Sequence, residues 1–256
     1  MKLKKNLGQH LLNNQSILDK IAAMANTETV IEIGPGTGNL TEYLLKNINI
    51  KRLILVEKDP DMIEKLKLRF NDNRLEIYNQ DATILSLKDF NLTQKTSVIG
   101  NFPYNVGNSI IINLVEQIEY ITKIVAMLQK EVVQRFCATP KTKDYGKLTV
   151  LCGTFCTAKK TMDIGPNNFT PPPKVMSSIL ELIPKEQNIT KEQYQEIIKF
   201  CNIGFGNRRK KLIPLLKQHF DAEQISKIIP ILPNENVRIE ELSIEKIIEI
   251  IKMNCK

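Results

Sequence analysis

The sequence predicts an α/β protein, in which a doubly wound, mostly parallel sheet is followed by a small C-terminal all-helical domain. Short β-rich apolar runs alternate with amphipathic segments through the first two thirds of the chain. Such alternation is typical of a parallel sheet with helices on both faces. From about Thr190 onward only helix patterns remain. We therefore predict two domains, 1–185 and 186–256.

Apolar periodicity places the individual elements. The predicted strands are TVIEI (29–33), RLILVE (52–57), LEIYN (75–79), TSVIGN (96–101) and KIVAML (123–128), with helices over 38–47, 60–69 and 107–119. In the C-terminal part Thr190 can cap a helix over KEQYQEIIKFCNI, and further helices fit 208–219, 221–229 and 243–252. Ligands of such a sheet bind beyond the carboxyl ends of its strands.

Charge and cysteine content narrow the class of protein. The 256 residues include 36 Lys and Arg against 28 Asp and Glu, a net charge of +8, which favours a polyanionic partner without proving one. The five cysteines form no C-x-x-C pair, and only His10 and His219 could join them, so we expect reduced thiols and no metal site. No signal peptide and no membrane-spanning run is evident, so we expect a cytoplasmic protein without membrane contact.

A glycine-rich turn follows the first predicted strand. Gly34, Gly36 and Gly38 allow a tight turn and let a ligand touch the main chain, although a turn without any ligand is the alternative. Their G-x-G-x-G spacing differs from the dinucleotide fingerprint G-x-G-x-x-G, which weighs against NAD. The next two strand ends carry Glu57, which can bind both ribose hydroxyls, and Asp81, which can reach an adenine amine. Together they predict a nucleoside pocket suited to S-adenosylmethionine.

The fourth strand ends in the turn Asn101-Phe102-Pro103-Tyr104. Proline ends the strand and fixes the backbone, so the neighbouring groups are held rigidly; an ordinary turn before a helix is the alternative. The amide oxygen of Asn101 and a nearby main-chain carbonyl can accept both hydrogens of adenine N6, and Tyr104 offers a face on which a base stacks. The pattern suits methylation of an exocyclic amine, with positioning supplying most of the acceleration.

These motifs resemble those of a known enzyme class. EIGPGTGNLT, Glu57 and NQDA are similar to the cofactor motifs of class I methyltransferases, and NFPY resembles the form used by rRNA adenine N6-dimethyltransferases. KKNLGQHLLNN, LQKEVVQRFCATP, YGKLTVL and NFTPPPKVMSSILEL resemble segments of that family in order. The resemblance implies a Rossmann-like class I methyltransferase sheet, with S-adenosylmethionine as methyl donor and no metal.

The resemblance also implies roles for single residues. In the opening motif the family has an Asn, here replaced by His10, and a Leu matched by Leu12, which contact the cofactor. Phe169 corresponds to the aromatic residue that covers the other face of the target base, while a stiff linker is the alternative reading of TPPPKV. The predicted cofactor-binding residues are thus His10, Leu12, Gly34, Gly36, Gly38, Glu57, Asp81 and Asn101.

A basic run is predicted to bind RNA phosphates, with salt-dependent and sequence-independent affinity. The run is Arg208, Arg209, Lys210 and Lys211, which Lys4 and Lys5 extend; a solvated helix face is the alternative. FGNRRKKL and VRIEELSIEKIIEI resemble segments of KsgA-type small-subunit rRNA dimethyltransferases, which Erm-type relatives generally lack.

The resemblance therefore implies a particular reaction. We expect a monomeric enzyme that dimethylates N6 of two adjacent adenosines near the 3′ end of 16S rRNA, acting on a precursor of the 30S subunit. The alternatives are an Erm-type enzyme of 23S rRNA, an assembly factor whose binding outweighs its catalysis and, more remotely, a dehydrogenase.

Overall fold

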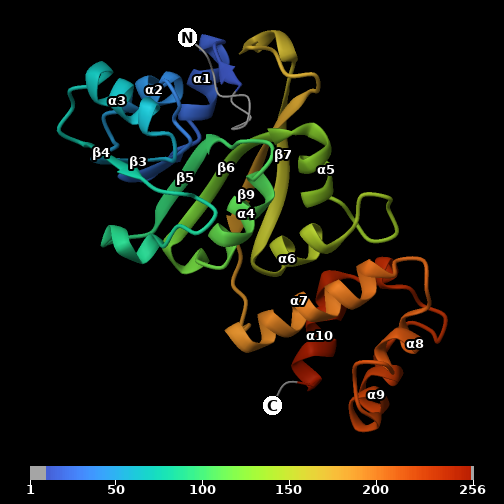
Figure 1. The fold of residues 1–256 in the computed structure, drawn as a ribbon. Helices are drawn as coiled ribbons and strands as arrows, with labels where there is room; N and C mark the ends of the chain where they lie inside the picture. Colours follow the sequence, from blue (N-terminus) through green and yellow to red (C-terminus); the bar gives the residue numbers. More distant parts are fainter. Residues whose placement is uncertain (1–9, 255–256) are drawn as a thin grey trace. The chain divides into compact units, whose positions relative to one another are not determined.

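The computed structural model describes residues 10–254, and most of their strands form one seven-stranded sheet in the order β4-β3-β2-β5-β6-β9-β7. The strands are β2 (Thr29–Ile33), β3 (Arg52–Glu57), β4 (Leu75–Asn79), β5 (Thr96–Asn101), β6 (Ile121–Gln129), β7 (Cys156–Ile164) and β9 (Ser177–Pro184). The pairs from β4 to β6 are parallel, whereas β9 runs antiparallel to β6. Figure 1 shows the late strands β9 and β7 at the β6 side of the sheet, where β9 pairs with β6 and β7 follows β9. The predicted α/β class with a mostly parallel sheet is confirmed.

Helices cover the central part of this sheet because the central strands are apolar on both faces. All five residues of β2 are buried, as expected for a central parallel strand. One hydrophobic cluster joins Leu18, Leu44 and Leu66 of three helices to the strand residues Leu53 and Ile99. The helices that follow the early strands are α1 (Gln15–Ala22), α2 (Asn39–Lys46), α3 (Pro60–Arg69), α4 (Gly107–Val115) and α5 (Lys130–Phe136), with short 3-10 turns η2 (Leu87–Phe90), η3 (Ile118–Tyr120) and η4 (Pro166–Asn168).

The strand order places the ligand edge of the sheet. From β2 the chain passes outward to β3 and β4, and then returns to the other side of β2 with β5. Ligands of open α/β sheets bind at the carboxyl ends of the strands where the order reverses. The turns after β2 and β5 are therefore the expected centre of a site.

A short antiparallel ladder, which the sequence analysis does not predict, lies beside that edge. β1 (Leu11–Leu12) pairs with β8 (Phe169–Thr170), with Leu12 opposite Phe169. The ladder is extended by a hydrogen bond of 2.9 Å from the Asn13 N–H to the Asn168 carbonyl. It joins two segments that are far apart in the sequence.

The structure divides into two compact units. The first comprises Met1–Val133 and Thr157–Pro184, and the second comprises Gln134–Cys156 and Lys185–Lys256. Residues 134–156, which the sequence analysis places in the first domain, thus group with the C-terminal residues. The functions assigned to the two predicted domains stay predictions.

The second unit is helical in the part that the structure describes. Its helices are α6 (Lys147–Phe155), α7 (Lys191–Gly206), α8 (Leu212–Leu216), α9 (Ala222–Ile228) and α10 (Ile244–Asn254), with 3-10 turns η5 (Ile229–Ile231) and η6 (Ile239–Glu241). Thr190 caps α7 as predicted, since its hydroxyl accepts a hydrogen bond from the Gln193 N–H. No helix within residues 10–254 is long and apolar enough to cross a membrane.

Two predicted helices are shorter than expected by several residues: the helix predicted over 107–119 ends at Val115, and the helix predicted over 208–219 is reduced to a short segment. The segment 208–219 is helical only over Leu212–Leu216, so the basic run lies in the turn before α8. Pro214 explains why this second helix is shorter. In a helix that began at Arg208, residue 214 would have to donate its N–H to the carbonyl of Lys210, and proline has no N–H to donate. In the first turn of α8, by contrast, a proline is tolerated.

Candidate functional site

A cavity lies at the reversal of the strand order and brings most of the predicted site together. Its volume of about 120 Å³ far exceeds the roughly 10–15 Å³ that a single water molecule needs. The lining residues are His10, Leu11, Gly34, Gly36, Glu57, Lys58, Asp81, Asn101, Phe102, Pro103, Tyr104, Asn105 and Val106. Four successive strand ends of the first unit thus contribute to one site.

The glycine-rich turn has the backbone that its sequence predicts. Gly34, Gly36 and Gly38 have φ angles of 66°, 56° and 84°, in the left-handed region that glycine tolerates. A Cβ atom at Gly36 would lie 3.1 Å from Leu11 Cδ2, so the cavity wall is close there. Gly38 does not line the cavity. A Cβ atom at Gly38 would lie 2.4 Å from the ring of Phe70, so this glycine serves the packing of the turn.

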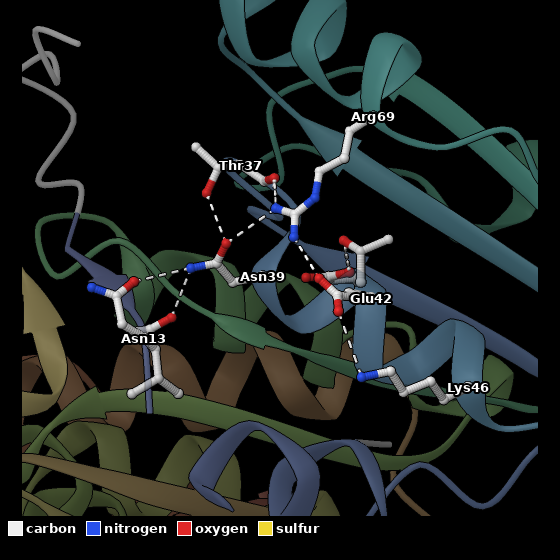
Figure 2. Close-up of polar contacts among 9 residues, drawn as sticks. Asn13, Thr37, Asn39, Glu42, Lys46 and Arg69 are labelled. Atoms are coloured by element: carbon white, nitrogen blue, oxygen red, sulfur yellow. Dashed lines mark hydrogen bonds and ion pairs between the residues drawn. The ribbon is translucent and has the colours of Figure 1, made fainter. Parts of the chain in front are cut away.

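A polar network holds this turn from outside the cavity (Figure 2). The Arg69 guanidinium donates to the Thr37 carbonyl at 2.6 Å and to the Glu42 carboxylate at 2.6 Å. The same hydrogen bond from Arg69 lowers the pKa of Glu42. The Asn39 amide donates to the Asn13 side chain at 3.1 Å. The turn is therefore tied both to α3 and to the segment before α1.

Glu57 is held in place by main-chain groups. It is buried, and its two carboxylate oxygens accept the N–H groups of Gly36 and Asp59 at 3.1 and 2.8 Å. Burial raises the pKa of Glu57, and these hydrogen bonds oppose the rise. Each carboxylate oxygen has a second lone pair, so both can still accept a ribose hydroxyl.

Asp81 is anchored from one side and ion-paired on the other. Its Oδ1 accepts the N–H and the hydroxyl of Thr83, and its Oδ2 lies 2.7 Å from Lys58 Nζ. The hydrogen bond from Lys58, followed by those from Thr83, lowers the pKa of Asp81 to about 2. Asp81 is therefore an ionised hydrogen-bond acceptor at the cavity.

The turn after β5 is fixed by contacts to three other segments. Asn101 Nδ2 donates to the His10 main-chain carbonyl at 2.6 Å, which leaves Oδ1 as the acceptor end of the amide. The Phe102 side chain is buried, and its N–H donates to the Met127 carbonyl. The Tyr104 hydroxyl lies 2.5 Å from Ser177 Oγ. Ser177 lies within the segment NFTPPPKVMSSILEL, but the sequence pattern did not single it out as a site residue.

Besides Gly38, the predicted residues Leu12 and Phe169 do not line this cavity. Leu12 lines a neighbouring cavity of about 30 Å³ together with Glu32, Gly34 and Asn101, while its neighbour Leu11 lines both cavities. Phe169 is only 4% exposed and packs in the same hydrophobic cluster as Leu12. In this structure Phe169 is a core residue, and its predicted place over a target base stays a prediction.

The predicted RNA-binding residues differ in their surroundings. Arg209, Lys210 and Lys211 are exposed. Arg208 is half-buried; it forms an ion pair with Glu240 and donates to the carbonyls of Thr142 and Lys143 at 2.7 and 2.6 Å. These three contacts occupy its guanidinium, so Arg208 supports the fold of the second unit. Lys4 and Lys5 lie outside the described residues.

Other cations, which are scattered in the sequence, gather near Arg208. Arg135, Lys143 and Lys147 line with it a cavity of about 360 Å³ in the second unit. They were missed because no single run contains them. Within residues 10–254 no group of three or more His, Cys, Asp and Glu side chains is arranged to hold a metal ion.

The fold and this site define a class I S-adenosylmethionine-dependent methyltransferase. The sequence profile described as "Ribosomal RNA adenine dimethylase" matches residues 1–256, so the chain belongs to the ribosomal RNA adenine dimethylase family. A "Ribosomal RNA small subunit methyltransferase A" from Coxiella burnetii is 35% identical over 260 residues, which cover 98% of this chain and 97% of that protein. The protein of the same name from Tolumonas auensis is 34% identical over 254 residues, 96% of this chain and 92% of that one.

Solved structures agree with this assignment. A dimethyladenosine transferase from Plasmodium falciparum has 29% sequence identity and a TM-score of 0.79, and the match covers 96% of this chain and 98% of that one. The 23S rRNA methyltransferase ErmE, at 19% identity and a TM-score of 0.68 over 94% of this chain and 98% of its own, shares the fold. The predicted fold class, enzyme class and methyl donor are confirmed.

Proposed function

We propose that this enzyme dimethylates N6 of two adjacent adenosines near the 3′ end of 16S rRNA. Its family is that of ribosomal RNA adenine dimethylases, and the small-subunit name of the curated relatives supports the 16S substrate. The proposal includes a 30S precursor as the partner, a monomeric enzyme and a cytoplasmic site of action. The observation that best supports methylation of an amine is the orientation of the Asn101 amide.

Asn101 is the residue that would recognise the target amine. Because its Nδ2 already donates to the His10 carbonyl, its Oδ1 is the end that remains to accept a hydrogen from N6. Such a hydrogen bond draws electron density back to a nitrogen whose lone pair is otherwise delocalised into the ring. The adenine amine thereby becomes a better nucleophile.

The cofactor side of the cavity is built from the other three strand ends. S-adenosylmethionine, when bound, supplies a methyl group on a positively charged sulfur. The bare main chain at Gly34 and Gly36 allows close approach, Glu57 would hold the ribose hydroxyls, and Asp81 would accept the adenine amine. Gly38 supports the same turn through its packing.

Positioning is the main catalytic contribution of the protein. Tyr104 offers a ring for stacking of the target base, which is worth on the order of 1–3 kcal/mol. Alignment of two held reactants lowers the barrier without a strong general base, because the cationic product amine loses its proton readily. The second unit, including the exposed cations Arg209, Lys210 and Lys211, would bind RNA phosphates.

Replacement of Asn101 tests this function. We expect Asn101→Ala to lower methylation of 16S rRNA at least about a hundredfold, because it removes the amine acceptor, with RNA affinity within about twofold of wild type. Asn73→Ala, at an exposed position before β4, is the matched control and should behave as wild type. Methyl transfer from labelled cofactor and filter binding of the RNA measure the two effects.

The substrate is identified by mapping methylated nucleotides in rRNA from a deletion strain, before and after the protein is returned. The proposal requires two adjacent dimethyladenosines in 16S rRNA that reappear with the wild-type protein. Modification of 23S rRNA instead would overturn the proposed substrate, and full turnover by Asn101→Ala would overturn the proposed mechanism.

A further inference from the structure

The aromatic ring of Tyr104 is held at two points by residues distant in the sequence. Its hydroxyl lies 2.5 Å from the Oγ of Ser177, which is completely buried at the start of β9. Its ring stacks against the imidazole of His10, with centroids 5.5 Å apart and planes 30° apart. His10 is itself tied down, since its Nδ1 lies 2.8 Å from the Pro171 carbonyl.

We propose that His10 and Ser177 form a clamp that fixes Tyr104 as a one-sided stacking platform for the target base, and that both are positioning residues for methyl transfer. This inference rests on the proposed function. It assigns Ser177 a role that the resemblance of its segment, NFTPPPKVMSSILEL, did not imply. It also gives His10 a positioning role besides its predicted contact with the cofactor.

The clamp leaves Tyr104 one face for a base. An aromatic ring can stack on both sides, and the His10 imidazole occupies one of them. The bond to Ser177 holds the far end of the side chain, so the ring cannot swing away from the cavity. Burial raises the pKa of Tyr104, so its hydroxyl stays protonated at neutral pH and can serve a neutral hydrogen bond. One base is therefore presented to Asn101 at a time.

His10 serves the same turn through its main chain. Its carbonyl accepts the Asn101 amide at 2.6 Å, so one residue orients both the amine acceptor and the stacking ring. Both the imidazole Nδ1 and the main-chain oxygen of His10 are thus engaged with protein partners. His10 also lines the cavity beside Gly34 and Gly36, so its positioning role adds to its predicted contact with the cofactor.

Ser177 and Ser178 provide a matched pair of variants. Both side chains are completely buried in β9, but Ser178 donates to Asp163 at 2.6 Å instead of contacting Tyr104. We expect Ser177→Ala to lower kcat/KM for RNA about five- to tenfold, the size of one hydrogen bond. The Kd of S-adenosylhomocysteine, measured by calorimetry, should stay within about twofold. Ser178→Ala should leave kcat/KM within about twofold, although it removes a buried hydroxyl in the same way.

A double-mutant cycle shows whether Ser177 acts through Tyr104. Tyr104→Phe removes the other partner of the hydrogen bond, so adding Ser177→Ala to it should lower kcat/KM no further. His10→Phe, which keeps an aromatic ring, should retain more activity than His10→Ala. Additive effects of Ser177→Ala and Tyr104→Phe on kcat/KM would overturn the clamp. Equal losses of kcat/KM in Ser177→Ala and Ser178→Ala would overturn it as well.

A measurement without RNA separates the clamp from the proposed function. In protein with ring-labelled tyrosines, the NMR signal of Tyr104 is assigned from its loss in Tyr104→Phe. Ser177→Ala should shift that signal and Ser178→Ala should not. If the shift occurs but the wild-type protein methylates no rRNA, the proposed function fails and the contact stands. An unchanged Tyr104 signal in Ser177→Ala would overturn the clamp itself.

Discussion

Glu32 is an acidic side chain placed where a negative charge is costly. It is 1% exposed on β2, and its Oε2 accepts the hydroxyl of Thr41 at 2.7 Å. Burial raises the pKa of Glu32 to about 8, the bond from Thr41 opposes this rise, and the nearby Glu57 adds to it. The Glu32 carboxyl is therefore protonated at neutral pH. Because the protonated Glu32 carboxyl is neutral, it adds no second negative charge near Glu57 at the adjacent cavity.

This burial makes the stability of the ligand-free protein depend on pH. The folded pKa of about 8 lies above the ordinary value of 4.5, so the stabilisation from Glu32 is complete below pH 4.5 and is lost as the pH rises toward 8. The loss follows because the unfolded chain ionises while the folded protein does not, at up to about 1.4 kcal/mol per pH unit.

Glu32→Gln removes this dependence while it keeps an acceptor for Thr41. We expect the variant to be more stable than wild type at pH 7.5, and the difference should shrink as the pH falls toward 4.5. Urea denaturation at a series of pH values measures it. A constant difference between the two proteins across this range would contradict the raised pKa.

At the scale of single elements, the glycine-rich turn shows how one residue joins a strand to two helices. Gly38 begins α2 with a left-handed φ of 84° and faces the ring of Phe70 at the end of α3. We expect Gly38→Ala to destabilise the protein by about 1–3 kcal/mol, because alanine is strained in that region and has no space there. Chemical denaturation measures this loss.

Gly206 is the control for this substitution. It ends α7 with no positive φ, and a Cβ atom there would meet nothing within 4 Å. Gly206→Ala should be neutral or stabilising by up to about 1 kcal/mol. Equal destabilisation by both substitutions would show that the position of the glycine does not matter.

Comparison of the individual elements shows which of them sequence patterns are enough to predict. The central strands β2, β3 and β5 were predictable because parallel strands buried on both faces are continuous apolar runs. β7 was missed because its residues between Cys156 and Ile164 are mostly exposed and polar, so no run stands out. β1 and β8 have two residues each, too few for any period. The start of α8 was predicted too early because the apolar periodicity was followed although Pro214 cannot donate the N–H that a helix from Arg208 would require.

At the scale of the whole molecule, the basic run before α8 divides into two kinds of residue. Arg208 is engaged by Glu240 and two carbonyls, whereas Lys210 and Lys211 are exposed. We expect Lys210→Ala with Lys211→Ala to reduce the slope of log affinity for RNA against log salt by about 0.7–0.9 for each phosphate that the variant no longer neutralises. Thermal stability should be unchanged.

Arg208→Ala should behave in the opposite way. It removes the contacts that hold the segment at Thr142 and Lys143, so we expect a loss of about 1–2 kcal/mol in stability with little change in the salt slope. Binding titrations between low and moderate salt, together with thermal melts, measure both variants. A reduced salt slope in Arg208→Ala at unchanged stability would assign it to the RNA instead.

The residues of the candidate site that come at the ends of predicted strands could be predicted from the sequence. Gly34, Gly36, Glu57, Asp81 and Asn101 each follow an apolar run, and parallel strands bring those ends together. Ser177 could not be found in this way, because it enters the site from the start of an antiparallel strand that comes late in the sequence. Phe169 is buried because it pairs with Leu12 in a two-residue ladder and packs in the core. Such a long-range pairing cannot be predicted from a local sequence pattern.

That ladder has a consequence for how the protein is made. Leu11 and Leu12 find their partners only at Phe169 and Thr170, so the wall of the cavity joins the beginning of the chain to a segment synthesised much later. Contacts with such a long separation in sequence form slowly, because a large loop must close first. During translation the early strands can assemble while the cavity stays unfinished. Competence to bind the cofactor is therefore expected only after most of the first unit has been synthesised.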